Sequence, residues 1–420
     1  MASKFGWVDF SESERKQMLD IVDLFNQQDT RDELGVGTIR DAFSDHLFPG
    51  TSTIQTRARY YLFVPWIYKD VERRLARKKL SMADFTKEVE RREKKLIRAL
   101  MAGGESDGVI GIEAKEKLQR LPSNIYWSGL HAFKIRLTEG SQSQYARHIS
   151  YYHRTPKSEA SGMNPRSKEH DEPTLESSGS GWHPGIPDPP NDLLKETSLK
   201  FTREEAGYLR ERVLQTHRES LFASFLLETN DTMGTDFVWE HPIVASLPEA
   251  QKDTVLHARN FSETIHGAVF LYNLMLSEAK ESQEGTDRYR DRLDQWALEL
   301  SQHWENTEKW CQNRQAFWQG PALEHARIPP LTRSFVDKWL NIVCESGGPK
   351  AIFENNEAKT LISHREHQLK KNRARLHNPD ALMRWSGASG TAQLDFRWRI
   401  AKAHLADIYA GLNGKEGTNA

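Results

Sequence analysis

Helical periodicity is the feature that most limits the fold of this chain. In the second half, apolar residues recur three and four positions apart over one segment after another. The clearest faces are Phe261, Ile265, Ala268, Val269, Tyr272 and Leu276; Leu293, Trp296, Leu300 and Trp304; and Phe335, Val336, Trp339, Leu340 and Val343. This spacing is typical of amphipathic helices that pack one face against a core. Because no run of alternating residues indicates a sheet, the sequence predicts an all-α, predominantly helical protein with at most short peripheral strands.

A polar segment at 154–192 separates two helical parts. Seven Pro, four Gly and six Ser make up 17 of its 39 residues, and such a composition buries too little apolar surface to offset the entropy of ordering. We interpret it as a flexible linker or long surface loop, with its Pro-rich end at 182–190 docked on a domain. The length of 420 residues fits two domains.

The predicted organisation is therefore an N-terminal helical domain at 1–153, the linker at 154–192, a C-terminal helical domain at 193–413 and a disordered tail at 414–420. Because segments with Arg beside aromatic residues lie on both sides of the linker, at 57–60 and 397–399, we expect the two helical parts to pack together.

Local signals predict individual helices. An amphipathic helix is expected at 11–27, and a second should open at 51–53 and run through 60–68, where Pro65 should kink or interrupt it. The stretch 112–137 has the pattern of two short helices and is compatible with a helix-turn-helix unit. Thr202 and Glu205 have the spacing of a capping box that opens a helix.

Helices are also expected near the C-terminus. A basic helix should cover 355–376 and end before Pro379, and a final helix should run from about 391 to 412.

Composition narrows the function classes. Lys plus Arg number 58 against 59 Asp plus Glu, so binding to a polyanion requires a local patch. Cys311 and Cys344 are too few for a disulfide framework or a cysteine-rich zinc site and suit a reducing compartment, so we expect a cytoplasmic protein. No apolar run approaches the roughly 20 residues that span a bilayer, and we expect no membrane role beyond surface attachment.

The strongest local charge lies at 57–98, where fourteen Lys or Arg stand against six Asp or Glu. Such a run is usually a solvated helix face, and a surface for the backbone of nucleic acid is the alternative interpretation.

Catalytic motifs are weak. The phosphate-binding loop is missing, and Gly104-Glu105-Ser106-Asp107-Gly108 matches the hydrolase elbow without the strand that must precede it. His364 and His367 lack a His-Glu-x-x-His pattern, and Asp107, Glu113 and Lys115 are too closely spaced for a nuclease set. We expect no cofactor and no metal, and the sequence favours a protein that is not an enzyme.

Two Gly-hydroxyl stretches that lead into Arg-aromatic segments are the candidate phosphate-binding elements. Free backbone N–H groups, hydroxyls and a nearby guanidinium can cradle a phosphate, although Ser and Thr also cap helices and Arg also packs on aromatic rings. The candidate residues are Thr51, Ser52, Thr53, Gln55, Arg57 and Arg59 in the first stretch, and Arg384, Ser389, Thr391, Arg397 and Arg399 in and around the second.

Four segments carry a resemblance to a known family: Phe5-Gly6-Trp7-Val8-Asp9-Phe10, the stretches at 30–43 and 48–60, and Gly387-Ala388-Ser389-Gly390 with Leu394-Asp395-Phe396-Arg397-Trp398. With these segments, the chain resembles an uncharacterised bacterial family known only as a domain of unknown function. The resemblance implies a setting in antiphage defence islands, near helicases and phospholipase-D-type nucleases. It implies no catalytic residue.

From these features we predict a non-enzymatic accessory subunit of a bacterial antiphage defence system. The subunit would bind DNA or RNA, a helicase or phospholipase-D-type nuclease of the same system, or both. Two alternatives remain open at this point: a metal-dependent nuclease whose site is built from scattered residues, and a purely structural protein–protein adaptor.

Overall fold

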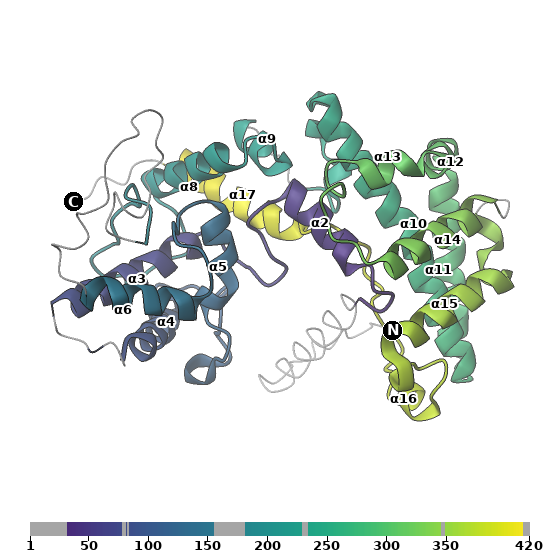
Figure 1. The fold of residues 1–420 in the computed structure, drawn as a ribbon, viewed down its shortest axis with the longest axis horizontal. Helices are drawn as coiled ribbons and strands as arrows, with labels where there is room; N and C mark the ends of the chain where they lie inside the picture. Colours follow the sequence, from purple (N-terminus) through teal and green to yellow (C-terminus); the bar gives the residue numbers. More distant parts are fainter. Residues whose placement is uncertain are drawn as a thin grey trace, which may run out of the picture. The chain divides into compact units, whose positions relative to one another are not determined.

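The computed structural model describes residues 32–77, 81, 84–154, 181–228, 234–345 and 349–414. These residues are predominantly helical (Figure 1), which confirms the fold class that the periodicity predicts. The one β-type pairing among them is an isolated antiparallel bridge between Arg136 and Trp182. In this described part, the chain has no helix with the length and apolarity needed to cross a membrane. The amphipathic helix expected at 11–27 falls outside it.

Two compact units make up the chain, and each combines segments that are far apart in sequence. We call them the α10 unit, drawn from 1–43 and 252–396, and the α3 unit, drawn from 44–251 and 397–420. Each unit thus contains residues from both sides of 154–192, the segment at which the sequence analysis divided the chain. Helix α2 (Gly37–Leu47) contains the first crossing from one unit to the other.

Helix α3 forms the centre of the α3 unit. Every residue from Tyr60 to Tyr68 is buried, as expected for a helix that is covered on all sides. Helices α4 and α5 pack on α3, and α17 packs on α8 and α9. The helices of this unit are α3 (Tyr60–Ala76), α4 (Phe85–Ala102), α5 (Pro122–Ala132), α6 (Gln142–Arg154), α8 (Arg203–Thr216), α9 (Leu221–Leu227) and α17 (Trp398–Asn413), with short 3-10 helices η2 (Lys115–Lys117), η3 (Val238–Glu240) and η4 (Pro242–Ser246).

Several helices begin or end away from their predicted positions. Helix α3 begins at Tyr60 rather than at 51–53, and it continues through Pro65. Helix α17 begins at Trp398 rather than near 391, because Phe396 and Arg397 before it have φ angles of 50° and 66°, which no right-handed helix allows. A φ of 49° at Lys371 likewise ends the basic helix early.

Other local predictions have mixed outcomes. The capping box is confirmed, because the Glu205 amide donates to Thr202 Oγ1 over 3.2 Å and the Thr202 amide donates to Glu205 Oε2 over 3.0 Å. The stretch 112–137 contains one α-helix, α5, preceded by the single 3-10 turn η2, rather than two α-helices.

The predicted docking of the Pro-rich segment is confirmed for the residues from 181 onward. The Trp182 ring is buried against Tyr68, Trp127 and Tyr145, and its Nε1 donates to Glu72 over 2.9 Å. Farther along, the carbonyl of Pro187 accepts a hydrogen bond of 2.7 Å from Trp66 Nε1. These contacts make this end of the segment an integral part of the α3 unit.

The α10 unit is built around the longest helix, α10 (Glu249–Ala279). Its backbone accepts hydrogen bonds from two tryptophans, Trp296 Nε1 to the Glu263 carbonyl and Trp339 Nε1 to the Thr264 carbonyl. The surrounding helices are α11 (Gln283–Ser301), α12 (Trp304–Gln312), α13 (Arg314–Gln319), α14 (Pro330–Glu345), α15 (Asn356–Lys370) and α16 (Pro379–Met383), with 3-10 helices η5 (Pro349–Glu354) and η6 (Lys371–Arg373).

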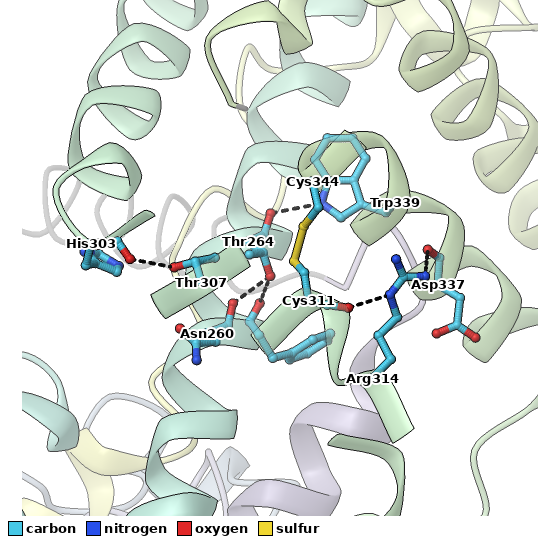
Figure 2. Close-up of a disulfide and its surroundings, with 10 residues drawn as sticks. Asn260, Thr264, His303, Thr307, Cys311, Arg314, Asp337, Trp339 and Cys344 are labelled. Atoms are coloured by element: carbon cyan, nitrogen blue, oxygen red, sulfur yellow. Dashed lines mark hydrogen bonds between the residues drawn. A yellow bond between two sulfur atoms is a disulfide. The ribbon is translucent and has the colours of Figure 1, made fainter. Parts of the chain in front are cut away.

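The two cysteines of the chain meet in the α10 unit. Cys311 on α12 and Cys344 on α14 form a disulfide with a Cα–Cα distance of 6.6 Å (Figure 2). The sequence analysis treated them as too few for a disulfide framework and as suited to a reducing compartment. The packing of α12 against α14 brings the two cysteines together, and a count of cysteines cannot predict such packing.

A buried carboxylate joins α4 to the start of α5. Glu93 is fully buried, and it accepts hydrogen bonds from the amide of Ser123 over 2.7 Å and from its hydroxyl over 2.8 Å. Burial raises the pKa of Glu93 from 4.5 to about 7, although the Ser123 hydrogen bonds oppose this shift. The folded protein therefore holds a proton at Glu93 that the unfolded chain releases near pH 4.5.

This raised pKa predicts a pH-dependent contribution to stability. The contribution is fully present below pH 4.5, and it is lost as the pH rises to about 7. Glu93→Gln keeps an acceptor for the Ser123 amide but has no proton to lose. Over this range the free energy of unfolding of the wild type should therefore fall relative to the variant, by about 3 kcal/mol at 1.4 kcal/mol per pKa unit. Urea denaturation at several pH values measures the difference, and parallel curves would contradict the assignment.

Candidate nucleic-acid interface

Helix α4 presents a continuous row of positive side chains to solvent. Its opposite face is buried through apolar residues such as Phe85, Val89 and Leu96. The exposed row lies at positions three and four apart, which places its members on one side of an α-helix. We call it the basic stripe: Lys87, Arg91, Lys95 and Arg98. This stripe is one outward-facing part of the predicted basic segment 57–98, and Arg73, Arg74 and Arg77 at the end of α3 are exposed as well.

A groove of about 560 Å³ runs beside the basic stripe. Arg91, Lys95 and Arg98 line it from α4, and Lys195 lines it from the segment before α8. Ala99 and Leu194 complete its apolar part, and Glu116 of η2 is its only carboxylate. With four cations and one anion among its lining residues, this basic groove attracts anions.

Most cations of the basic groove also have a local carboxylate neighbour. Arg91 pairs with Glu88 over 2.7 Å, and Arg98 pairs with Glu116 over 2.6 Å. Lys195 pairs with Asp192 over 3.2 Å. Both members of the Arg98 and Lys195 pairs are largely exposed, and such surface pairs contribute only about 0–1 kcal/mol, so a phosphate can replace their carboxylates at low cost. Lys95 has no ion-pair partner within the described ranges.

Glu88 forms ion pairs with two arginines, Arg91 and Arg92. Hydrogen bonds from Arg91 and Arg92, opposed by burial, lower the pKa of Glu88 to about 2. Arg92 itself points away from the groove: it is buried, and it pairs with Glu88 over 2.8 Å and with Asp70 over 2.7 Å. Arg92 of α4 is thus bound to α3 through its ion pair with Asp70.

In the first Gly-hydroxyl stretch, the side chains satisfy the local backbone. Thr51 Oγ1 donates to the Phe48 carbonyl over 2.6 Å, and Gln55 Nε2 donates to the Gly50 carbonyl over 3.1 Å. The Ser52 amide in turn donates to Gln55 Oε1. Such local bonds favour turns over helix, which explains why α3 does not begin here. Ser52 is half-buried and Thr53 is exposed.

The two arginines of this stretch are held by carboxylates within the α3 unit. Arg57 makes bonds of 2.9 Å and 2.6 Å to Asp407 of α17, which also accepts the Ala58 amide over 2.8 Å. Arg59 is 5% exposed and forms a two-bond pair with Glu205 of α8, at 2.9 Å and 2.7 Å. These bonds join the segment just before α3 to α8 and α17.

The candidate residues of the second stretch fall in different units. Arg384, Ser389 and Thr391 belong to the α10 unit, where Arg384 is exposed and the other two are buried. The Ser389 amide donates to Asn273 Oδ1 over 2.9 Å. Arg397 and Arg399 belong to the α3 unit.

One contact brings the two stretches together inside the α3 unit. Arg397 Nη1 donates to the Thr51 carbonyl over 2.8 Å and pairs with Asp45 over 2.5 Å. Arg399 is exposed on α17. The structure thus joins Thr51 with Arg397, while Arg57 and Arg59 are each joined to a carboxylate.

The histidines and the elbow sequence singled out in the sequence lie in local packing contacts and in a loop. Among the described residues, no group of three His, Cys, Asp or Glu side chains is arranged to hold a metal ion. His367 packs its ring on His377 at 4.9 Å between centroids, and His364 Nε2 lies 2.8 Å from Gln368 Nε2. The Gly104–Gly108 elbow sequence is a loop that follows helix α4, as the sequence analysis expected.

The sequence analysis located the basic segment but did not select its outward residues. The spacing of Lys87, Arg91, Lys95 and Arg98 is readable from the sequence once α4 is placed, and it separates them from the inward Arg92. Lys195 has no sequence signal, because it reaches the groove through tertiary packing.

Replacing Arg59 tests the structural assignment of this predicted phosphate ligand. Arg59→Met leaves Glu205 buried without its cation, which should lower the free energy of unfolding by about 3–5 kcal/mol. The exposed Arg384→Met is the matched control, with an expected change within about 0.5 kcal/mol. Adding Glu205→Gln to Arg59→Met should restore part of the loss. Equal urea midpoints for Arg59→Met and wild type would contradict the assignment.

Comparison with known proteins places the chain in a family without adding a function. A search of curated proteins found no match, and a search of solved structures found none either. A family model described as a family of unknown function (DUF6361) matches residues 2–411. The match covers nearly the whole sequence, and the chain therefore belongs to this family of unknown function.

Proposed function

We propose that this protein binds the phosphate backbone of nucleic acid, DNA or RNA, through the basic groove beside α4. It would do so as a non-enzymatic accessory subunit of a bacterial antiphage defence system. The observation that supports binding is the groove itself, whose lining residues include Arg91, Lys95, Arg98 and Lys195 against the single carboxylate Glu116. The defence setting, with a helicase and a phospholipase-D-type nuclease as partners, comes from the family resemblance alone.

The length of the basic stripe suits an extended anion. Lys87 and Arg98 are eleven residues apart on one helix, a distance of roughly 16 Å along its axis. One strand of a nucleic acid presents a phosphate about every 3.4 Å along the duplex axis. The stripe can therefore follow several consecutive phosphates, whereas a single small anion would engage only part of it.

The lining of the basic groove favours contact with phosphates over contact with bases. It contains no aromatic side chain on which a base could stack and no Asn or Gln that could read a base edge. Arginines can read guanine, but Arg91 and Arg98 are each already paired with a carboxylate of the protein. We therefore expect binding that depends strongly on salt and little on nucleotide sequence.

Salt dependence provides the primary test. The binding constant of the full-length protein for a mixed-sequence DNA duplex, and for an RNA of the same sequence, is measured by fluorescence anisotropy at increasing KCl. The logarithm of the constant should fall with the logarithm of the salt concentration, with a slope of about −0.9 for each phosphate neutralised. The proposal fails if the wild-type protein shows no salt-sensitive binding to either nucleic acid.

Charge reversal then locates the surface. Arg91→Glu with Lys95→Glu should weaken binding by about tenfold or more, and Lys95→Gln alone should reduce the salt slope by about one. Lys338→Glu, at an exposed position on α14, is the matched control and should bind like wild type. Circular dichroism confirms that each variant is folded.

The charge-reversal result can also contradict the proposal. If Arg91→Glu with Lys95→Glu binds like wild type, the α4 groove is not the binding surface. A structural adaptor is then favoured if the purified protein binds a purified helicase or nuclease partner without nucleic acid.

A further inference from the structure

The disulfide between Cys311 and Cys344 joins two packed helices, α12 and α14. The closed loop spans 33 residues, from α12 to the end of α14 (Figure 2). These are the only two cysteines among 420 residues. Both cysteines of the chain are therefore used in this one disulfide.

The two sulfur-bearing residues differ in their access to solvent. Cys311 is 1% exposed and faces the interior of the α10 unit, whereas Cys344 lies in the last turn of α14 and is partly exposed. Thiol–disulfide exchange requires that a small thiol or disulfide approach one sulfur. Since Cys344 is the more exposed of the two residues, exchange should begin at Cys344.

Other contacts keep α12 near α14 when the sulfur link is absent. Arg314, just after α12, donates from Nε to the Cys311 carbonyl over 2.9 Å and from Nη1 to the Asp337 carbonyl over 3.3 Å (Figure 2). Trp310 Nε1 also donates to His257 Nδ1 of α10 over 2.8 Å. The α10 unit should therefore remain folded with both cysteines reduced.

Helix α12 nevertheless depends on its attachments. It spans only nine residues, Trp304–Gln312, and helices of this length are unstable in isolation. A covalent link to the sixteen-residue helix α14 removes much of its freedom to open locally. Reduction should loosen α12 without unfolding the protein.

We propose that Cys311 and Cys344 form a reversible thiol–disulfide pair that exchanges with small-molecule disulfides, of which glutathione disulfide is the probe, and that its redox state sets the local stability of α12. This proposal is independent of nucleic-acid binding.

Oxidation of the two cysteines by glutathione disulfide takes two thiol–disulfide exchange steps. In the reduced protein, the Cys344 thiolate attacks one sulfur of glutathione disulfide, forms a mixed disulfide and releases one glutathione thiolate. The Cys311 thiolate then attacks the Cys344 sulfur, forms the internal disulfide and releases the second glutathione. The two protein thiols lose two electrons and two protons, and glutathione disulfide gains them. Reduction runs the same steps backward, with glutathione attacking the accessible Cys344 sulfur.

The test is a redox titration of the full-length wild-type protein. The protein is equilibrated at a series of glutathione to glutathione disulfide ratios, free thiols are alkylated, and intact mass is recorded. The expected result is one reversible transition in which both thiols appear or disappear together. A pair that stays oxidised in excess glutathione is a permanent link, and thiols that never pair show that the contact does not form; either result overturns the proposal.

Two variants identify the reacting sulfur. Cys311→Ser should form the mixed disulfide with glutathione on Cys344 faster than Cys344→Ser forms it on Cys311, because Cys311 is buried and reacts only when α12 opens. The reverse pattern would overturn the assignment of Cys344 as the point of exchange.

Hydrogen exchange tests the effect on α12. In the reduced wild type, and equally in the double variant Cys311→Ser with Cys344→Ser, amides of Trp304–Gln312 should exchange about tenfold or more faster than in the oxidised protein. Amides of α15 serve as the internal control and should change little. Equal exchange of α12 in both redox states would overturn its part in the proposal.

Discussion

The α3 unit depends on two ion pairs at the start of its central helix. Arg57 and Arg59, separated by one residue, bind Asp407 of α17 and Glu205 of α8. They join an early segment of the chain to two segments that are at least 146 residues away in sequence. Arg59 and Glu205 are both buried, and loss of either partner would leave an unpaired buried charge, so this pair joins the segment before α3 to α8. Helix α4, which carries the basic groove, packs directly on α3.

Positive charge consequently serves two separate purposes in one stretch of sequence. Inward arginines such as Arg59 and Arg92 are buried with carboxylates and stabilise helix packing. The outward cations on α4 are exposed. Arg91 and Arg98 pair with carboxylates at the surface, whereas Lys95 has no ion-pair partner among the described residues. All three line the basic groove. Replacing a buried arginine would leave its carboxylate unpaired, whereas the exposed cations make pairs of the kind that contributes little to stability. This division underlies the proposed function.

Sequence patterns predicted the helical class, the capping box at Thr202 and the docking of the segment around Trp182, because each depends on local spacing or on the burial of one large side chain. They failed where tertiary contacts decide. Hydroxyls at 51–53 resemble helix caps, yet Thr51 binds the Phe48 carbonyl, and α3 begins later. The carboxylate partners of Arg57 and Arg59 lie far along the chain, so local sequence could not reveal these pairs. Lys195 and the Cys311–Cys344 link could not be predicted for the same reason.

The central claim is that nucleic acid is bound by the outward cations of α4 and not by the arginines at the start of α3. Hydrogen exchange of the full-length protein, compared with and without a saturating DNA duplex at low salt, tests it most directly. The account predicts slower exchange in peptides that cover Lys87–Arg98, Glu116 and Lys195, with little change in the peptide that covers Thr51–Arg59. Protection of Thr51–Arg59 with none on α4 would contradict it.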